Sequence, residues 1–213
     1  MAEQFVSIVP DELERAAAYR LMISIIVPRP IAWVSTVGAD GTPNLAPYSF
    51  FTGVGGTPPT VMISVGRSRR ESGPLKDTLR NAQETGEFVV SLVDESLAEA
   101  MNLTSGDWPP GVDEFDVAGL ETAPSVDVRP PRVAASPVAL EARVTQIVPV
   151  EGTTNTLVLG RVLRYHVRKD LLRPNGMVDA ALMRPVARLG GTEYATFGQV
   201  FSMPRPTVDQ AKT

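Results

Sequence analysis

The sequence has no cysteine and a single histidine, His166, among its 213 residues. Without cysteine the chain cannot form disulfides, thiolate zinc sites or cysteine-ligated iron–sulfur clusters, and it has no cysteine nucleophile. A metal site would need mostly carboxylates, and no group of acidic residues has the spacing of metal ligands, so we expect no metal. A redox reaction on this chain would therefore require a bound cofactor.

Long apolar runs and an excess of positive charge are also missing. No stretch approaches the roughly 20 apolar residues of a membrane span. The acidic N-terminus lacks the basic start and apolar run of a signal peptide, which predicts a cytoplasmic protein. The formal net charge of −4 does not favour a nucleic-acid partner. With 43% hydrophobic and 21% charged residues, the sequence predicts one domain over residues 1–203 and a polar tail over 204–213.

Motifs of the common nucleotide-binding and hydrolytic folds are absent as well. The segment GVGGT (53–57) is similar to a dinucleotide-binding loop, but it lacks the G-x-G-x-x-G spacing and a following helix. The sequence contains no Walker motif and no G-x-S-x-G nucleophile elbow. Because His166 is the one histidine, a Ser-His-Asp triad has little support.

The chain combines many strands with a few short helices, in no regular βαβ order. Composition and end signals predict helices over residues 10–22, 75–86 and 94–103. Apolar runs predict strands over residues 29–37, 43–54, 58–66, 87–93, 137–150 and 156–170. This pattern predicts a mainly β fold with short helices, in which an antiparallel sheet closes wholly or partly into a barrel.

Turn and loop residues divide these elements. Asp40 and Gly41 predict a hairpin turn after the first strand, and Gly86 is placed to end the second helix. Pro47 excludes residues 43–54 from forming a regular central strand. Residues 104–137 are rich in Pro, Gly, Ser and acids, which predicts mostly loop, forming a lid or a wrapping arm.

Three segments of the sequence together resemble one protein family. They are VPRPIAWVSTVGADGTPNLAPYSFF (27–51), PPTVMISVG (58–66) and KDTLRNAQETGEFVVSLVDE (76–95), and the later piece RPVARLGGTEY (184–194) also fits. The chain resembles the flavin reductase-like family over residues 18–195. The resemblance implies an FMN-binding split β-barrel, an antiparallel Greek-key barrel, with FMN bound at a homodimer interface. Many members reduce flavin with NADH or NADPH, whereas others only carry electrons.

Lys76, Asp77 and Thr78 open the second expected helix and suit the FMN phosphate. Unpaired amides and the helix dipole at a helix start favour an anion. Lys76 adds a positive charge and Thr78 a hydroxyl. Arg67, which follows Gly66 in the preceding loop, could add further positive charge. The alternative is a capped and solvated helix start that holds no ligand.

Polar side chains near the tip of the first hairpin suit the rest of the flavin. Ser35 and Thr36 end the first strand, and Asn44 lies opposite them, where short polar groups suit the ribityl chain and the phosphate. Ordinary strand-end polarity is the alternative. Trp33 could line the surroundings of the flavin ring, or it could belong to the core or to a dimer interface.

The backbone around Pro47 is a second candidate for flavin contacts. We expect Pro47 to interrupt the ladder, so that backbone groups at Ala46, Tyr48 and Ser49 are free to face a ligand. The resemblance implies that such amides hydrogen-bond the pyrimidine edge of the flavin. Donors at that edge would stabilise the reduced, anionic ring.

His166 lies in RVLRYHVRK (161–169), on the more polar face of its expected strand. A histidine occurs at this kind of position, near the flavin or the nicotinamide, in some relatives, so His166 is the catalytic candidate. A solvent-facing residue on an edge strand is the alternative. Arg184 and Arg188 could anchor the phosphates of a pyridine nucleotide or pair with carboxylates within the dimer.

These observations predict an FMN-binding NAD(P)H:flavin oxidoreductase that passes hydride from NADH or NADPH to FMN, mainly by positioning the two. The alternative is a flavoredoxin-like electron-transfer protein that takes electrons from a redox partner protein and is not turned over efficiently by NAD(P)H. We expect a homodimer, with no nucleic-acid or membrane partner. The candidate cofactor-binding residues are Trp33, Ser35, Thr36, Asn44, Ala46, Pro47, Tyr48, Ser49, Gly66, Arg67, Lys76, Asp77 and Thr78.

Overall fold

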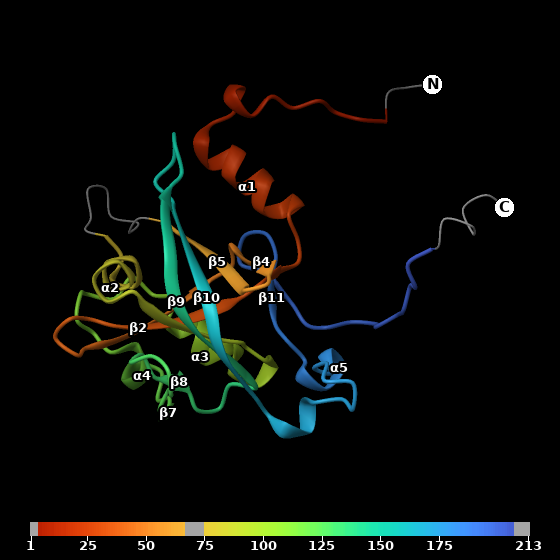
Figure 1. Cartoon of the computed structure of the whole chain (residues 1–213). Helices are drawn as coiled ribbons and strands as arrows, with labels where there is room; N and C mark the ends of the chain where they lie inside the picture. Colours follow the sequence, from red (N-terminus) through yellow and green to blue (C-terminus); the bar gives the residue numbers. More distant parts are fainter. Residues whose placement is uncertain (1–3, 67–74, 207–213) are drawn as a thin grey trace.

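The computed structural model of the chain describes residues 4–66 and 75–206, and its largest element is a curved antiparallel sheet (Figure 1). Seven strands form this sheet in the order β3-β2-β6-β9-β10-β5-β4. Their bounds are β2 Ala32–Val37, β3 Pro43–Tyr48, β4 Phe51–Gly56, β5 Pro59–Val65, β6 Glu87–Ser91, β9 Val138–Pro149 and β10 Thr156–Val167. The mainly β fold that the sequence predicts is confirmed.

The sheet curls until its two edges meet. Its edge strands β3 and β4 follow one another in the chain, and only Ser49 and Phe50 connect them. Three steps between Cα atoms span about 11 Å at most, so the end of β3 and the start of β4 lie within that distance. The N–H of Ser64 in β5 also donates to the carbonyl of Phe50 over 2.9 Å. The result is a partly closed barrel. The prediction of a single strand over 43–54 is therefore wrong, because this stretch forms β3 and β4.

Apolar side chains from the strands and from α2 (Asp77–Thr85) fill the barrel. Phe88 and Ile63 are among its largest fully buried side chains. Burial of a side chain of this size stabilises the fold by about 1.5–3 kcal/mol. Gly160 on β10 makes room for Phe88, because a Cβ atom there would stand 2.4 Å from two carbons of the ring.

A second apolar cluster lies on the outer side of β2 and β3, under α3 (Ala98–Leu103) and α4 (Glu114–Val117). Trp33, Leu45 and Phe115 belong to it, while Val34, the neighbour of Trp33, points into the barrel. Both faces of β2 are therefore buried. This explains why Ala32, Trp33 and Val34 are apolar in succession and do not alternate with polar residues.

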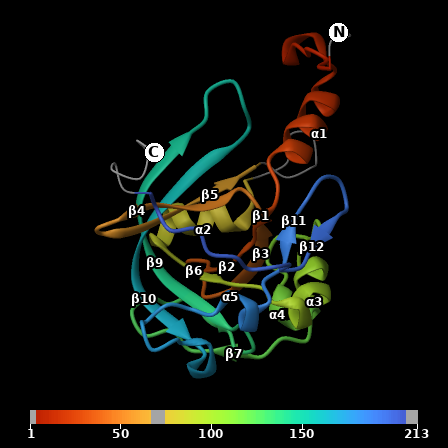
Figure 2. The ribbon, with the colours of Figure 1, turned by 90° about the vertical axis from the view of Figure 1, so that its right-hand side faces the viewer.

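Shorter elements surround the barrel. The helix α1 (Arg15–Ile25) points away from it (Figures 1 and 2). Gly86 ends α2 in the left-handed conformation, with φ of 70°, as predicted. The remaining elements are the 3-10 helices Pro10–Glu12 (η1), Glu95–Leu97 (η2) and Lys169–Leu171 (η3), the helix α5 Ala180–Met183, and the strands β1 Arg29–Pro30, β7 Thr122–Ala123, β8 Arg132–Val133, β11 Ala187–Arg188 and β12 Tyr194–Ala195.

Three regions differ from the sequence-based expectation. The helix expected over 10–22 is a 3-10 turn followed by α1, which runs on to Ile25. The region 104–137, expected to be mostly loop, contains α4 and the pair β7–β8. The strand expected over 29–37 is divided at Ile31 into β1 and β2, and β1 joins β11 and β12 in a small separate sheet. In the part of the chain that the structure describes, no helix has the length and apolar character needed to cross a membrane.

Candidate functional site

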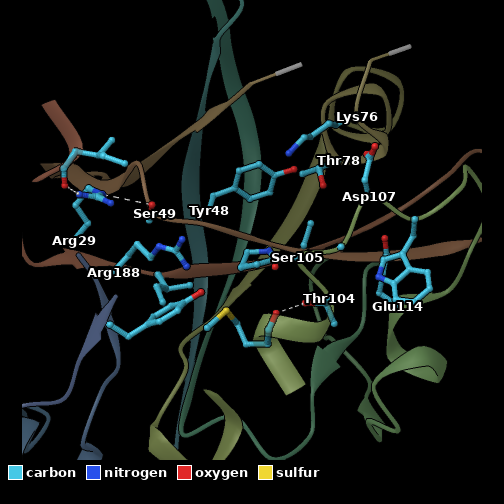
Figure 3. Close-up of a pocket in the computed structure, with 18 of the residues that line it drawn as sticks. Arg29, Tyr48, Ser49, Lys76, Thr78, Thr104, Ser105, Asp107, Glu114 and Arg188 are labelled. Atoms are coloured by element: carbon cyan, nitrogen blue, oxygen red, sulfur yellow. Dashed lines mark hydrogen bonds between the residues drawn. The ribbon is translucent and has the colours of Figure 1, made fainter. Parts of the chain in front are cut away.

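A cavity of about 470 Å³ lies beside the edge strand β3. The other walls come from α1 and β1, the start of α2, the segment 104–108 after α3, and the β11–β12 hairpin (Figure 3). Its volume falls within the roughly 300–1,000 Å³ that is usual for small-molecule sites. The cavity is the candidate functional site, and it contains eight of the predicted residues: Asn44, Ala46, Pro47, Tyr48, Ser49, Lys76, Asp77 and Thr78.

The wall formed by β3 is a regular edge strand. It pairs with β2 in unbroken register from Pro43 to Tyr48, so the predicted interruption of the ladder at Pro47 is wrong. The N–H of Leu45 donates to Glu114 Oε2 over 2.8 Å, so it points away from β2. Antiparallel alternation then turns the N–H groups of Ala46 and Tyr48 toward β2. Pro47 falls on the outer side, where the ladder needs no donor, which confirms that this strand is not a central one.

Polar groups gather where the start of α2 meets β3. Asn44 Nδ2 donates to Thr78 Oγ1 over 3.0 Å, and Thr78 is buried. Lys76 precedes α2, and its Nζ stands 5.6 Å from the centre of the Tyr48 ring. Asp77 forms an ion pair with Arg80, with 2.6 Å between Nη1 and Oδ1. This end of the cavity therefore combines a helix start, a lysine and a hydroxyl.

The hydroxyl of Tyr48 is buried in the same region and points toward Thr78 (Figure 3). Among the described residues it has no hydrogen-bond partner that meets normal geometry. Burial raises the pKa of Tyr48, so its hydroxyl is protonated at neutral pH. A buried polar group of this kind is satisfied when a ligand supplies the missing partner.

Glu114 adds a carboxyl group that the sequence did not single out. It is buried, and its Oε2 accepts the hydrogen bond from Leu45. Burial raises the pKa of Glu114 to about 7, and the nearby charges of Asp77 and Asp113 act in the same direction. The cavity wall thus carries a group that gains or loses a proton near neutral pH.

Trp33 lies behind the cavity wall and not on it. Its side chain is fully buried, and Nε1 donates to Thr104 Oγ1 over 2.9 Å. The Thr104 hydroxyl in turn donates to the carbonyl of Met101 over 2.8 Å. Of the roles considered for Trp33, the structure shows a core residue that fixes Thr104, which does line the cavity.

Of the remaining predicted residues, Ser35, Thr36 and Gly66 also lie outside the cavity lining. Ser35 donates to the carbonyl of Pro131 over 2.5 Å, and Thr36 accepts a hydrogen bond from Asn81 over 3.1 Å. Both side chains are fully buried. Gly66 follows the end of β5, and Arg67 falls in the segment 67–74, outside the described residues.

His166 is not brought to the cavity. Its Nε2 lies 2.5 Å from Oε1 of Glu141, which is fully buried on β9. Glu141 also accepts the N–H groups of Val126 and Asp127. Burial opposes ionisation of Glu141, but these hydrogen bonds outweigh it and hold its pKa below the usual value. His166 therefore helps to fasten the 124–131 segment to the barrel.

The opposite end of the cavity is cationic. Arg29, which the sequence did not mark, and Arg188, which it did, both line it (Figure 3). Arg184, the other arginine considered, forms an ion pair with Glu95 and does not line this cavity. No local sequence pattern marked Arg29 as a site residue, because the pairing of β1 with β11 brings it to the cavity.

Comparisons with known proteins agree with this fold. A family model described as "Flavin reductase like domain" matches residues 24–183. Nitrilotriacetate monooxygenase component B from Bacillus cereus is 36% identical, with a TM-score of 0.90 over 95% of this chain and 100% of that one. Pseudomonas fluorescens 2-nitrobenzoate 2-nitroreductase is 31% identical, with a TM-score of 0.85 over 95% and 98%.

A third structure, from Shewanella frigidimarina, is described as a flavin reductase with a split barrel domain. It is 21% identical, with a TM-score of 0.82 over 92% of this chain and 96% of that one, and so shows the shared fold. The partly closed barrel is thus the split barrel that the sequence predicts. With the family model covering most of its length, the chain belongs to the flavin reductase-like family.

Proposed function

We propose that the chain is an FMN-binding NAD(P)H:flavin oxidoreductase and that the cavity beside β3 holds the flavin. One observation carries this proposal: Lys76, Thr78 and the start of α2 meet β3 at one end of the cavity. A phosphate there would meet a positive charge, a hydroxyl and the helix-start amides that have no carbonyl partner within the helix. The membership in the flavin reductase-like family supports a flavin as the ligand.

The rest of the cavity suits the other parts of FMN. Asn44, Ser49, Thr104 and Ser105 offer side-chain groups for the hydroxyls of the ribityl chain. The protonated Tyr48 hydroxyl supplies one more donor whose partner is missing. When bound, FMN supplies the ring that accepts and releases hydride, and the residues of the chain hold and orient it.

The named relatives support a redox role. One is component B of nitrilotriacetate monooxygenase and another is a 2-nitrobenzoate 2-nitroreductase. We propose NADH or NADPH as the electron donor for this chain, since either can pass a hydride directly to a bound flavin. The positioning of the two rings, more than side-chain acid–base chemistry, then sets the rate.

We further propose that the working form is a homodimer. The helix α1 and the residues on either side of it expose several large apolar side chains, among them Phe5, Val6, Tyr19, Ile25 and Ile26. Tyr19 also lines the cavity, so a partner seated on α1 would come close to the site. Exposed apolar patches of this kind are typical of protein interfaces. Light scattering coupled to size exclusion tests this proposal, and a monomeric mass at micromolar concentration refutes it.

The first experiment is a visible spectrum of the purified protein with FMN, followed by anaerobic addition of NADH or NADPH. We expect bound flavin and rapid loss of its oxidised band with at least one nucleotide. Bound flavin that neither nucleotide reduces would contradict the reductase and favour a flavoredoxin-like electron carrier. A protein that binds no flavin would refute both.

The phosphate site is tested by the double variant Lys76→Ala with Thr78→Ala. Because it removes one charge-assisted and one neutral hydrogen bond, FMN affinity should fall by about 2–4 kcal/mol, or about 30- to 1,000-fold in Kd. Fluorescence titration with FMN measures the change. Lys169→Ala is the matched control, because Lys169 is an exposed lysine outside the cavity. Equal affinity of the double variant and the control would refute the phosphate assignment.

A further inference from the structure

Two arginines stand directly opposite one another at the cationic end of the cavity. Arg29 on β1 is the register partner of Arg188 on β11, and both side chains line the cavity. Like charges that face each other across two antiparallel strands are destabilising. Arg29 is also buried, which makes the arrangement more costly. An arrangement of this kind calls for a compensating anion.

Three backbone carbonyls and the Ser49 hydroxyl accept hydrogen bonds from Arg29, but these neutral groups do not neutralise its charge. Its Nη1 donates to the carbonyls of Ile23 and Ile26 over 2.5 and 2.6 Å, and Nη2 donates to that of Leu189 over 2.8 Å. These hydrogen bonds connect the end of α1 to the end of β11. They also hold the Arg29 guanidinium in place in the cavity wall. Burial lowers the pKa of Arg29, Tyr19 acts in the opposite direction, and the charge of Arg188 lowers the pKa again. The two neighbouring guanidinium groups thus disfavour each other's charge at this end of the cavity.

Arg188 is held in the geometry of an anion-binding group. Its guanidinium lies over the ring of Tyr194, 4.4 Å from the centre, and Nη2 donates to the carbonyl of Gly191. These two contacts restrain the guanidinium, whose other N–H groups can bind a bidentate acceptor such as a carboxylate or a phosphate. Within the described residues, neither Arg29 nor Arg188 forms an ion pair with a carboxylate.

We propose that Arg188, supported by the charge of Arg29, binds the anionic group of the second reactant that meets the flavin. This inference rests on the proposed function, which assigns the flavin phosphate to the opposite end of the cavity at Lys76 and Thr78 (Figure 3). The ligand group that Arg188 recognises is a phosphate or a carboxylate, which can accept two parallel N–H hydrogen bonds through two of its oxygens. The source is either the pyrophosphate of a nicotinamide nucleotide or the carboxylate of an organic electron acceptor.

The test compares wild-type protein with Arg188→Gln and with Arg188→Lys. The lysine keeps the positive charge but lacks the paired N–H donors of the guanidinium. Arg184→Gln is the matched control, because that arginine pairs with Glu95 outside the cavity. Three quantities are measured for each variant: the Kd for FMN, the nucleotide concentration that gives half the maximal rate of anaerobic flavin reduction, and inhibition by pyrophosphate or benzoate. Thermal melting confirms that each variant is folded.

We expect Arg188→Gln to leave the Kd for FMN unchanged and to weaken binding of the second anion about 10- to 100-fold. Arg188→Lys should recover part of that loss, and the control should match wild type. Pyrophosphate that inhibits wild type but not Arg188→Gln identifies the nucleotide as the ligand, whereas the same result with benzoate identifies a carboxylate acceptor. An unchanged response of Arg188→Gln to both anions overturns the proposal, as does a weakening confined to FMN. Wild type that binds no FMN would instead refute the proposed function itself.

Discussion

Glu114 makes the stability of the ligand-free protein depend on pH in an unusual direction. Its pKa is about 7 in the folded protein and 4.5 for an ordinary glutamate, so the folded state binds more protons between these values. Stability conferred by the protonated carboxyl is therefore fully present below about pH 4.5 and is lost as the pH rises to about 7. Above that pH the loss is complete and constant.

The size of this effect follows from the same two values. The interval corresponds to about 3 kcal/mol at about 1.4 kcal/mol per pH unit, and water at the cavity mouth reduces it to about 2 kcal/mol. Glu114→Gln keeps an oxygen that can accept the Leu45 N–H but cannot ionise. The free energy of unfolding of wild type should therefore fall by about 2 kcal/mol relative to Glu114→Gln between pH 5 and pH 8.

Urea unfolding of both proteins without flavin, at half-unit steps of pH and constant ionic strength, measures this difference. The midpoint and the slope are compared at each pH, since a change of slope would signal a different denatured state. Parallel profiles for wild type and Glu114→Gln would refute the argument that burial controls this carboxyl. A wild-type profile that rises relative to the variant would show that Glu114 is ionised and stabilising in the folded protein.

Three further substitutions test the packing and the hydrogen bonds described above. Gly160→Ala should destabilise the barrel by about 1–3 kcal/mol or more, since its methyl group would overlap the Phe88 ring, and a melting curve measures it. Trp33→Phe removes the donor to Thr104 and should cost about 1–3 kcal/mol of stability, which urea unfolding detects. His166→Ala should cost about 1–2 kcal/mol without changing the Kd for FMN. A selective loss of FMN affinity in His166→Ala would restore that residue to the flavin site.

The parts of the fold that the sequence predicted best are those fixed by local chemistry. Gly86 ends α2 where a left-handed residue is needed, and Asp40-Gly41 turns the chain between β2 and β3. The strand expected over 43–54 failed for a non-local reason. The stretch PNLAPYSFFTGV contains no turn signal as strong as Asp40-Gly41, and the closure of the barrel sends β3 and β4 to opposite edges at Ser49 and Phe50.

The candidate site was predictable to the extent that it lies on the first hairpin and on α2. Residues 44 and 46–49 lie along one strand edge, and Lys76 and Thr78 mark a helix start, so both patterns are visible in the sequence. Arg29, Glu114 and the 104–108 segment reach the cavity only through tertiary packing. The hydroxyls of Ser35 and Thr36 had the right chemistry but serve inner contacts, because both faces of β2 are covered.

The outer edge of β3 protects the protein against edge-to-edge aggregation. The three positions whose N–H groups would face outward are Pro43, Leu45 and Pro47; two of these residues have no N–H, and Glu114 takes the third. A strand from another molecule would find no donors with which to extend the sheet. Pro47 and Glu114, which line the cavity, therefore also protect the edge of the sheet against aggregation. Replacing Pro47 with an ordinary strand residue such as Val would open this edge to strand addition.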